Sequence, residues 1–137
     1  MPDFTLDPRL FADTVPVAEL PLSRLLLATD ARFPWTILVP RRTDCAEIID
    51  LAPNDRMTLL DEIARVSEAL RDITACDKLN VAALGNVVRQ LHVHVVARFT
   101  ADAAWPGPIW GRGEAVAYEP AARDRLIAQL RDSLPFA

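Results

Sequence analysis

The most informative part of the sequence reads Asn86-Val-Val-Arg-Gln-Leu-His-Val-His-Val-Val-Ala-Arg98. It is rich in β-branched residues, and this predicts a long strand over Val87–Phe99. Successive side chains of a strand point to opposite faces of a sheet. One face should therefore be apolar except for a single arginine and lie on the core. The other face should present Gln90, His92 and His94 in a row.

His92 and His94 are the only histidines of the 137 residues. One interpretation is that they lie on the solvated face of a half-buried sheet. A second is a metal site, but His-x-His supplies only two ligands and no third histidine exists. A third is a reaction site, because both histidines, Gln90 and an asparagine converge on one face of what we expect to be a central strand.

Upstream, the apolar runs Ser23–Thr29 and Trp35–Val39 predict a hairpin closed by a turn over residues 30–34. Asp7–Asp13 predicts a short helix, with its first residue as N-cap and a proline next. Between this helix and the hairpin, Pro16 and Pro21 are expected to break the chain.

A long helix is predicted from Asn54, a good N-cap residue, to about Thr74. Met57, Leu60 and Leu70 belong to an apolar row with the three-to-four spacing of an amphipathic helix. We expect this row to lie on the sheet.

A short strand over Leu79–Leu84 and a two-residue turn at Gly85-Asn86 are predicted to lead into the histidine strand. After that strand, Trp105 and Trp110 are interpreted as covering the core or a subunit interface, with ligand stacking as the other interpretation. A last helix is predicted from about Glu119 to Ser133. Separate hairpins and a long helix, without repeated strand–helix–strand units, favour an α+β fold with an antiparallel sheet.

Composition narrows the class of protein. The 15 basic and 19 acidic residues give a net charge of −4. The sequence has no Lys/Arg cluster of the kind that binds a phosphate backbone, so we expect no nucleic-acid partner. No run of about 18 apolar residues could span a membrane, and the first residues do not resemble a signal peptide. Cys45 and Cys76 form no CxxC pair and suggest a reducing compartment. We therefore expect a cytoplasmic protein with no membrane partner.

The segment Gln90-Leu-His-Val-His-Val-Val resembles the signature of the histidine triad (HIT) family, His-φ-His-φ-His-φ-φ, in which φ is apolar. The surrounding order is also similar. A hairpin ends in Ile37-Leu-Val-Pro-Arg-Arg42, and a long helix, a strand carrying Asn80, a glycine turn, the signature and a Trp-Pro follow. The resemblance covers roughly Leu22 to Trp110.

The resemblance implies one HIT-like domain over residues 1–137, with its core at about 22–110 and a C-terminal helix at about 119–133. Its fold would be an antiparallel sheet of about five strands with the long helix packed on it. Members of the family commonly pair through the helix and the sheet edge, so the resemblance also implies a homodimer.

In the family, the middle histidine of the signature attacks the α-phosphate of a nucleotide, and water then hydrolyses the nucleotidyl-histidine. This role falls on His92. Imidazole suits it, being neutral and nucleophilic near pH 7. His94 would donate to the phosphate oxygens or help to protonate the leaving group, and Gln90 takes the place of the first histidine.

For nucleotide binding, Asn80 and Asn86 resemble the residues that hold phosphate oxygens, and Asp30 the acidic residue that grips the ribose hydroxyls. From the residues alone, Asn80 and Asn86 can equally be strand-end and turn residues, and Asp30 a hairpin-turn aspartate. Gln90 is one of three positions at which this sequence lacks a histidine that family members often have. The other two are Trp35 and Thr43.

The implied function is hydrolysis or transfer at a nucleoside 5′-phosphoryl group, without a metal or cofactor. Dinucleoside polyphosphates and nucleoside phosphoramidates are the substrate classes. The alternative is a catalytically weak nucleotide-binding HIT protein that has lost its accessory histidines.

Overall fold

The computed structural model describes residues 4–134; residues 1–3 and 135–137, which the expected domain includes, lie outside the described residues. The elements in chain order are α1 (Pro8–Ala12), β1 (Thr14–Glu19), β2 (Ser23–Ala28), β3 (Trp35–Pro40), the 3-10 turn η1 (Ile48–Asp50), α2 (Pro53–Thr74), β4 (Lys78–Ala82), β5 (Val93–Arg98) and α3 (Pro120–Ser133). The strands form one antiparallel sheet in the order β1-β2-β3-β5-β4. The expected fold, a five-stranded antiparallel sheet with a long helix and a C-terminal helix, is confirmed.

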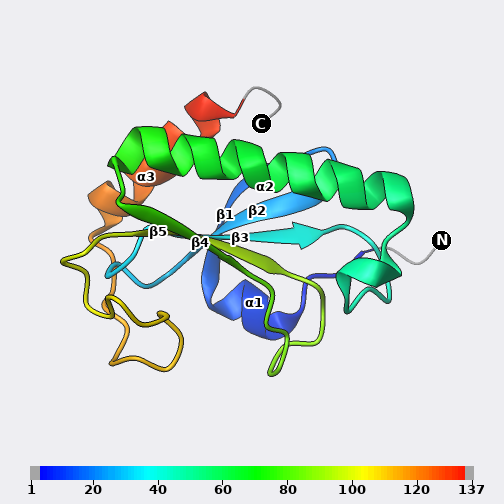
Figure 1. Ribbon diagram of the computed structural model, residues 1–137, viewed down its shortest axis with the longest axis horizontal. Helices are drawn as coiled ribbons and strands as arrows, with labels where there is room; N and C mark the ends of the chain where they lie inside the picture. Colours follow the sequence, from blue (N-terminus) through cyan, green and yellow to red (C-terminus); the bar gives the residue numbers. More distant parts are fainter. Residues whose placement is uncertain (1–3, 135–137) are drawn as a thin grey trace.

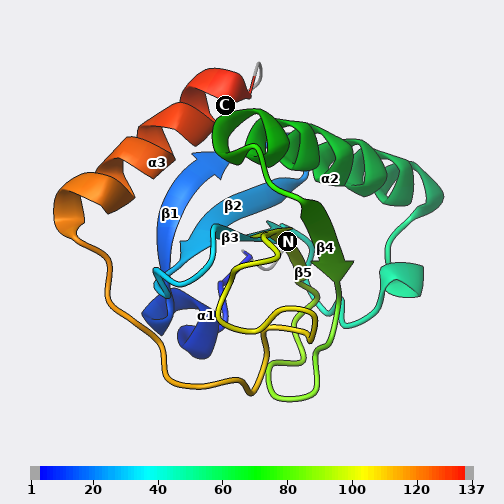
Figure 2. The ribbon, with the colours of Figure 1, turned by 60° about the vertical axis from the view of Figure 1, so that its left-hand side comes forward.

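Both faces of the sheet are covered. Helices α2 and α3 cross one face, and α1 lies on the other together with the segment that follows β5 (Figures 1 and 2). Alternate strand residues divide between the two sides, as the pleat of a strand requires. The core under α2 and α3 includes Leu25, Leu27, Leu38, Leu91, Val93, Val95 and Ala97. The other side holds Leu26, Ile37 and Val39 with Leu10 of α1, and Val96 with Phe33 and Ile109.

The histidine strand is shorter than the sequence suggests. β5 starts at Val93, and residues 83–92 form a loop in place of the expected two-residue turn, so Val87 is 76% exposed. The neighbouring strands explain this limit. β3 pairs with β5 only as far as Val93 and β4 only as far as His94, so the preceding residues have no strand to pair with. Instead, the Leu91 N–H donates to the Cys45 carbonyl.

The sequence does not predict β1, because Pro16 is expected to break the chain there. Proline lacks an N–H and is confined to edge strands and bulges. β1 is an edge strand, and its pairing with β2 is irregular between Pro16 and Ala18. The proline is therefore accommodated within a strand.

Helix α2 lies on the sheet with a different face from the predicted one. Met57 and Leu60 are 69% and 62% exposed. The buried residues are Leu59, Glu62, Val66, Ala69 and Leu70. The Glu62 carboxylate accepts a hydrogen bond from the Leu22 N–H at 2.7 Å, at the start of β2. A buried carboxylate needs such a donor, so this bond helps to fix which way the helix faces. The helix begins at Pro53, with Ala52 and not Asn54 as N-cap.

Candidate active site

The two histidines lie near the middle of the sheet, on the face away from α2. His94 is opposite Ile37 of β3 and Ala82 of β4, and His92 immediately precedes β5. Their ring centroids are 5.0 Å apart, and both side chains are buried. The prediction that the histidines share one face is confirmed.

The orientation of His92 follows from a backbone contact. Its Nδ1 lies 2.7 Å from the carbonyl oxygen of Gln90. A carbonyl oxygen can only accept, so Nδ1 carries the proton of the neutral ring and Nε2 keeps its lone pair. The bend before β5 thus holds His92 in the tautomer that a nucleophile attacking through Nε2 requires.

His94 is enclosed by aromatic rings. Trp35 is opposite Val96 in the β3–β5 pairing, which places it diagonal to His94 on the same face. Its Nε1 lies 2.9 Å from His94 Nδ1, and the Trp110 ring centroid lies 5.1 Å from that of His94. Burial, followed by the electrostatic interaction with His92, lowers the pKa of His94 from 6.5 to about 4. His94 is therefore neutral at physiological pH.

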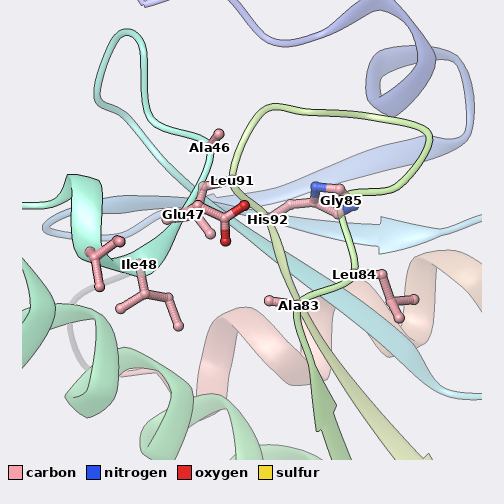
Figure 3. A pocket seen from close by; sticks show the side chains of 9 residues that line it. Ala46, Glu47, Ile48, Ala83, Leu84, Gly85, Leu91 and His92 are labelled. Carbon is pink, nitrogen blue, oxygen red and sulfur yellow. The ribbon is translucent and has the colours of Figure 1, made fainter.

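His92 and His94 line a cavity of about 700 Å³. This volume lies within the range of small-molecule sites. The walls are mostly apolar, from α1, β2, β3 and the segment after β5, and the polar groups include Asp30 and Asn86. A smaller cavity of about 270 Å³ shares His92 with the larger one. Figure 3 shows this smaller cavity between the segment carrying Ala46, Glu47 and Ile48 and the loop carrying Ala83 and Leu84.

Asp30 lies at the rim of the larger cavity but already has partners. Its carboxylate accepts hydrogen bonds from Arg32 Nη2 at 2.8 Å and from the Val116 N–H at 3.2 Å. Burial raises the pKa of Asp30, but the hydrogen bonds from Arg32 and Val116 outweigh burial and leave the pKa below its usual value. Asp30 therefore remains a carboxylate, and it ties the segment near residue 116 to the end of β2.

The sequence profile of the HIT domain matches residues 10–101 of the chain. The chain belongs to the histidine triad family. A search of curated proteins found no match. Membership indicates, in general terms, a nucleotide-binding hydrolase or transferase.

Three crystal structures of histidine triad proteins are similar over nearly the whole chain. The protein from Bradyrhizobium japonicum is 50% identical, with a TM-score of 0.96, covering 97% of this chain and 99% of that one. The protein from Sinorhizobium meliloti is 44% identical, with a TM-score of 0.94, covering 96% and 97%. The protein from Marinobacter aquaeolei is 41% identical, with a TM-score of 0.95, covering 99% and 100%.

Gln90, expected at the first position of the HIT signature, points its side chain away from this cavity. Its Oε1 accepts from the Asp7 N–H, and its Nε2 donates to the Thr5 carbonyl, both at 2.9 Å. Gln90 thus tethers the N-terminal segment, and its backbone carbonyl orients His92. It is not among the residues that line the cavity.

Asn80 is also outside the cavity lining and accepts a hydrogen bond from Arg98 Nη1 at 2.8 Å. Arg98 is buried and pairs with Asp102 at 2.8 Å, and its guanidinium also donates to the Gly107 carbonyl. The hydrogen bond from Arg98 holds the pKa of Asp102 well below its usual value. This cluster anchors the segment after β5 that carries Trp110.

Sequence reasoning missed several parts of this HIT site. Trp110 lines the cavity and contacts the ring of His94, whereas Trp105 packs over Arg98. Arg9 and Leu10 of α1 also line the cavity, about eighty positions before the signature, and no sequence signal links them to it. Two sequence features pointed toward this site: ligand stacking was one interpretation of Trp110, and the position of Trp35 often carries histidine in the family.

Residues 4–134 contain neither a metal-binding cluster of side chains nor a membrane-spanning helix. Within that range, no three or more His, Cys, Asp or Glu side chains are grouped so that they could hold a metal ion. No helix in the same range is long and apolar enough to cross a membrane.

Proposed function

We propose that this HIT protein hydrolyses or transfers a nucleoside 5′-phosphoryl group through a covalent bond between His92 and the α-phosphorus. The observation that carries the proposal is the hydrogen bond from His92 Nδ1 to the Gln90 carbonyl, which places the lone pair of the neutral ring on Nε2, and this ring lines the large cavity. No metal takes part in the proposed reaction.

In this proposal, His94 donates a hydrogen bond to a phosphoryl oxygen, while Asp30 and Asn86 contact the nucleotide from the cavity wall. Gln90 stands at the position of the first signature histidine. The group that orients His92 is the backbone carbonyl of this residue, which any amino acid provides, so a glutamine there is compatible with catalysis. Dinucleoside polyphosphates and nucleoside phosphoramidates remain the proposed substrate classes.

The test is to trap the intermediate with adenine and guanine forms of a dinucleoside polyphosphate. The reaction is quenched in alkaline denaturant, because a P–N bond is labile in acid, and the adduct is mapped by mass spectrometry. We expect a nucleotidyl group on His92 and none in His92→Ala. His94→Ala should form the same adduct more slowly, by about 10²–10³-fold, as for the loss of one stabilising donor. An adduct on His94, or one that survives His92→Ala, would contradict the assignment.

The alternative is a nucleotide-binding protein with little catalytic activity. The observation that favours it is the absence of histidine at Gln90, Trp35 and Thr43, where the family often has one. Tight nucleotide binding with no adduct, and with turnover unaffected by His92→Ala, would replace the catalytic proposal by this one.

We also propose that the whole chain of residues 1–137 is one domain and that it acts as a homodimer in the cytoplasm. In support of pairing, β4 is an edge strand of the sheet. Large apolar side chains are exposed on β4, in the loop after it, on η1 and on α2; these are Val81, Leu84, Ile48, Ile49, Met57 and Leu60. An apolar patch of this kind often marks a subunit interface.

A further inference from the structure

The contact between Trp35 and His94 constrains a proton. An indole N–H can only donate a hydrogen bond, and Trp35 Nε1 lies 2.9 Å from His94 Nδ1. His94 Nδ1 must therefore accept, which leaves the proton of the neutral ring on Nε2. The contact holds only while Nδ1 is unprotonated, so protonating His94 would also break it.

The two histidines consequently hold opposite tautomers. The Gln90 carbonyl makes His92 Nδ1 a donor, whereas the Trp35 indole makes His94 Nδ1 an acceptor. The pair offers one lone pair, on His92 Nε2, and one N–H, on His94 Nε2. Within residues 4–134, the ring contacts and strand partners of His94 other than His92 are all uncharged: Trp35, Trp110, Ile37 and Ala82. None of these four can supply His94 with a proton to pass on.

We propose that Trp35 is a positioning residue that keeps His94 a neutral Nε2–H donor, and that the site therefore prefers nucleotides whose leaving group departs without a proton. The substrate class is a phosphoric anhydride, such as a nucleoside polyphosphate, in preference to a phosphoramidate. This inference rests on the proposed function and narrows its two substrate classes to one.

The bonds that break and the protons that move explain why an anhydride is preferred to a phosphoramidate. His92 Nε2 attacks the α-phosphorus, the P–O bond to the leaving phosphate breaks, and that phosphate keeps the electron pair as an anion. Water then attacks the nucleotidyl group, the N–P bond returns its electrons to Nε2, and the water proton goes to solvent. A phosphoramidate differs because its nitrogen must gain a proton to leave as an amine. His94 could give its Nε2 proton only by becoming an imidazolate, since Trp35 occupies Nδ1.

The tautomers can be measured without any substrate. Nitrogen-15 chemical shifts of the two rings at pH 7 should show His94 protonated at Nε2 and unprotonated at Nδ1, with the opposite pattern for His92. In Trp35→Phe, which keeps an aromatic ring but lacks the donor, a population of His94 with a protonated Nδ1 should appear. Trp105→Phe, the same change over Arg98 and outside the cavity lining, should leave both patterns unchanged. A protonated His94 Nδ1 in the parent protein would overturn the inference.

The preference is tested by comparing single-turnover adduct formation from a dinucleoside polyphosphate and from a nucleoside phosphoramidate with the same base. We expect the phosphoramidate to react at least about 10²-fold more slowly, the lower range for a missing general acid. Trp35→His, whose ring can accept as well as donate, should narrow this ratio by about tenfold or more, whereas Trp105→Phe should not change it. Equal rates in the parent protein, or an unchanged ratio in Trp35→His, would overturn the preference. No adduct from either substrate would overturn the proposed function and the preference with it, while the nitrogen shifts still decide the role of Trp35.

Discussion

At the scale of single residues, His94 couples the site to the stability of the fold. Burial and the nearby His92 lower its pKa from 6.5 to about 4 in the folded chain. Between these two pH values the unfolded chain binds a proton that the folded chain does not. The contribution of His94 to the free energy of unfolding is therefore fully present above the higher value and is lost as the pH falls toward the lower one.

This gives a prediction for His94→Asn. The parent protein should lose up to about 3 kcal/mol of unfolding free energy between neutral pH and pH 4 because of this residue, and the variant should not. Denaturant unfolding measured at several pH values for both proteins provides the comparison. If the unfolding free energies of the two proteins change with pH in parallel, the lowered pKa of His94 does not contribute to stability.

At the scale of elements, helix α1 depends on a distant loop. It has five residues, too few to be stable alone, and it lines the large cavity through Arg9 and Leu10. The side chain of Gln90 binds the backbone just before it, at Thr5 and Asp7. The position expected to contribute a catalytic side chain thus holds a wall of the cavity in place.

We predict that Gln90→Ala loosens this wall. Two hydrogen bonds at about 1 kcal/mol each are lost, so amide exchange in α1 should accelerate by about tenfold or more, while exchange in β5 stays unchanged. Nucleotide affinity should fall as well. Arg89→Ala, at the exposed neighbouring position, is the matched control and should alter neither. Unchanged exchange in α1 of the Gln90 variant would refute the tether.

At the scale of the whole molecule, the apolar side chains that α2 turns outward are explained if a second copy covers them. Leu60→Arg would place a charge in that interface, where desolvation costs several kcal/mol, so dimer affinity should fall by at least about 100-fold. Analytical ultracentrifugation of the parent and the variant measures this. Phe11→Arg is the control, because Phe11 is 72% exposed on α1, on the other face of the sheet. A monomeric parent protein would contradict the proposed homodimer. A dimer unaffected by Leu60→Arg would contradict an interface that includes α2.

What the sequence determined by itself is what local patterns encode. The hairpin Ser23–Thr29 and Trp35–Val39, the long helix and the C-terminal helix are found within one or two residues of the predicted bounds, because turn residues and local residue preferences act over a few positions. The pairing of His92 and His94 on one face follows from the two-residue period of extended chain. The resemblance to the HIT family rests on the same short segment and on the order of elements around it.

The tertiary structure alone decided how long the histidine strand is, which face α2 buries and what each ring nitrogen contacts. A strand extends only as far as its neighbours, so β5 begins where β3 and β4 stop pairing with it. The rotation of α2 is linked to the bond from Leu22 to Glu62, forty positions apart. The tautomer of each histidine depends on one donor or acceptor brought close by folding, the Gln90 carbonyl for one and the Trp35 indole for the other. Such contacts join residues through space, and a linear pattern of residue types does not encode them.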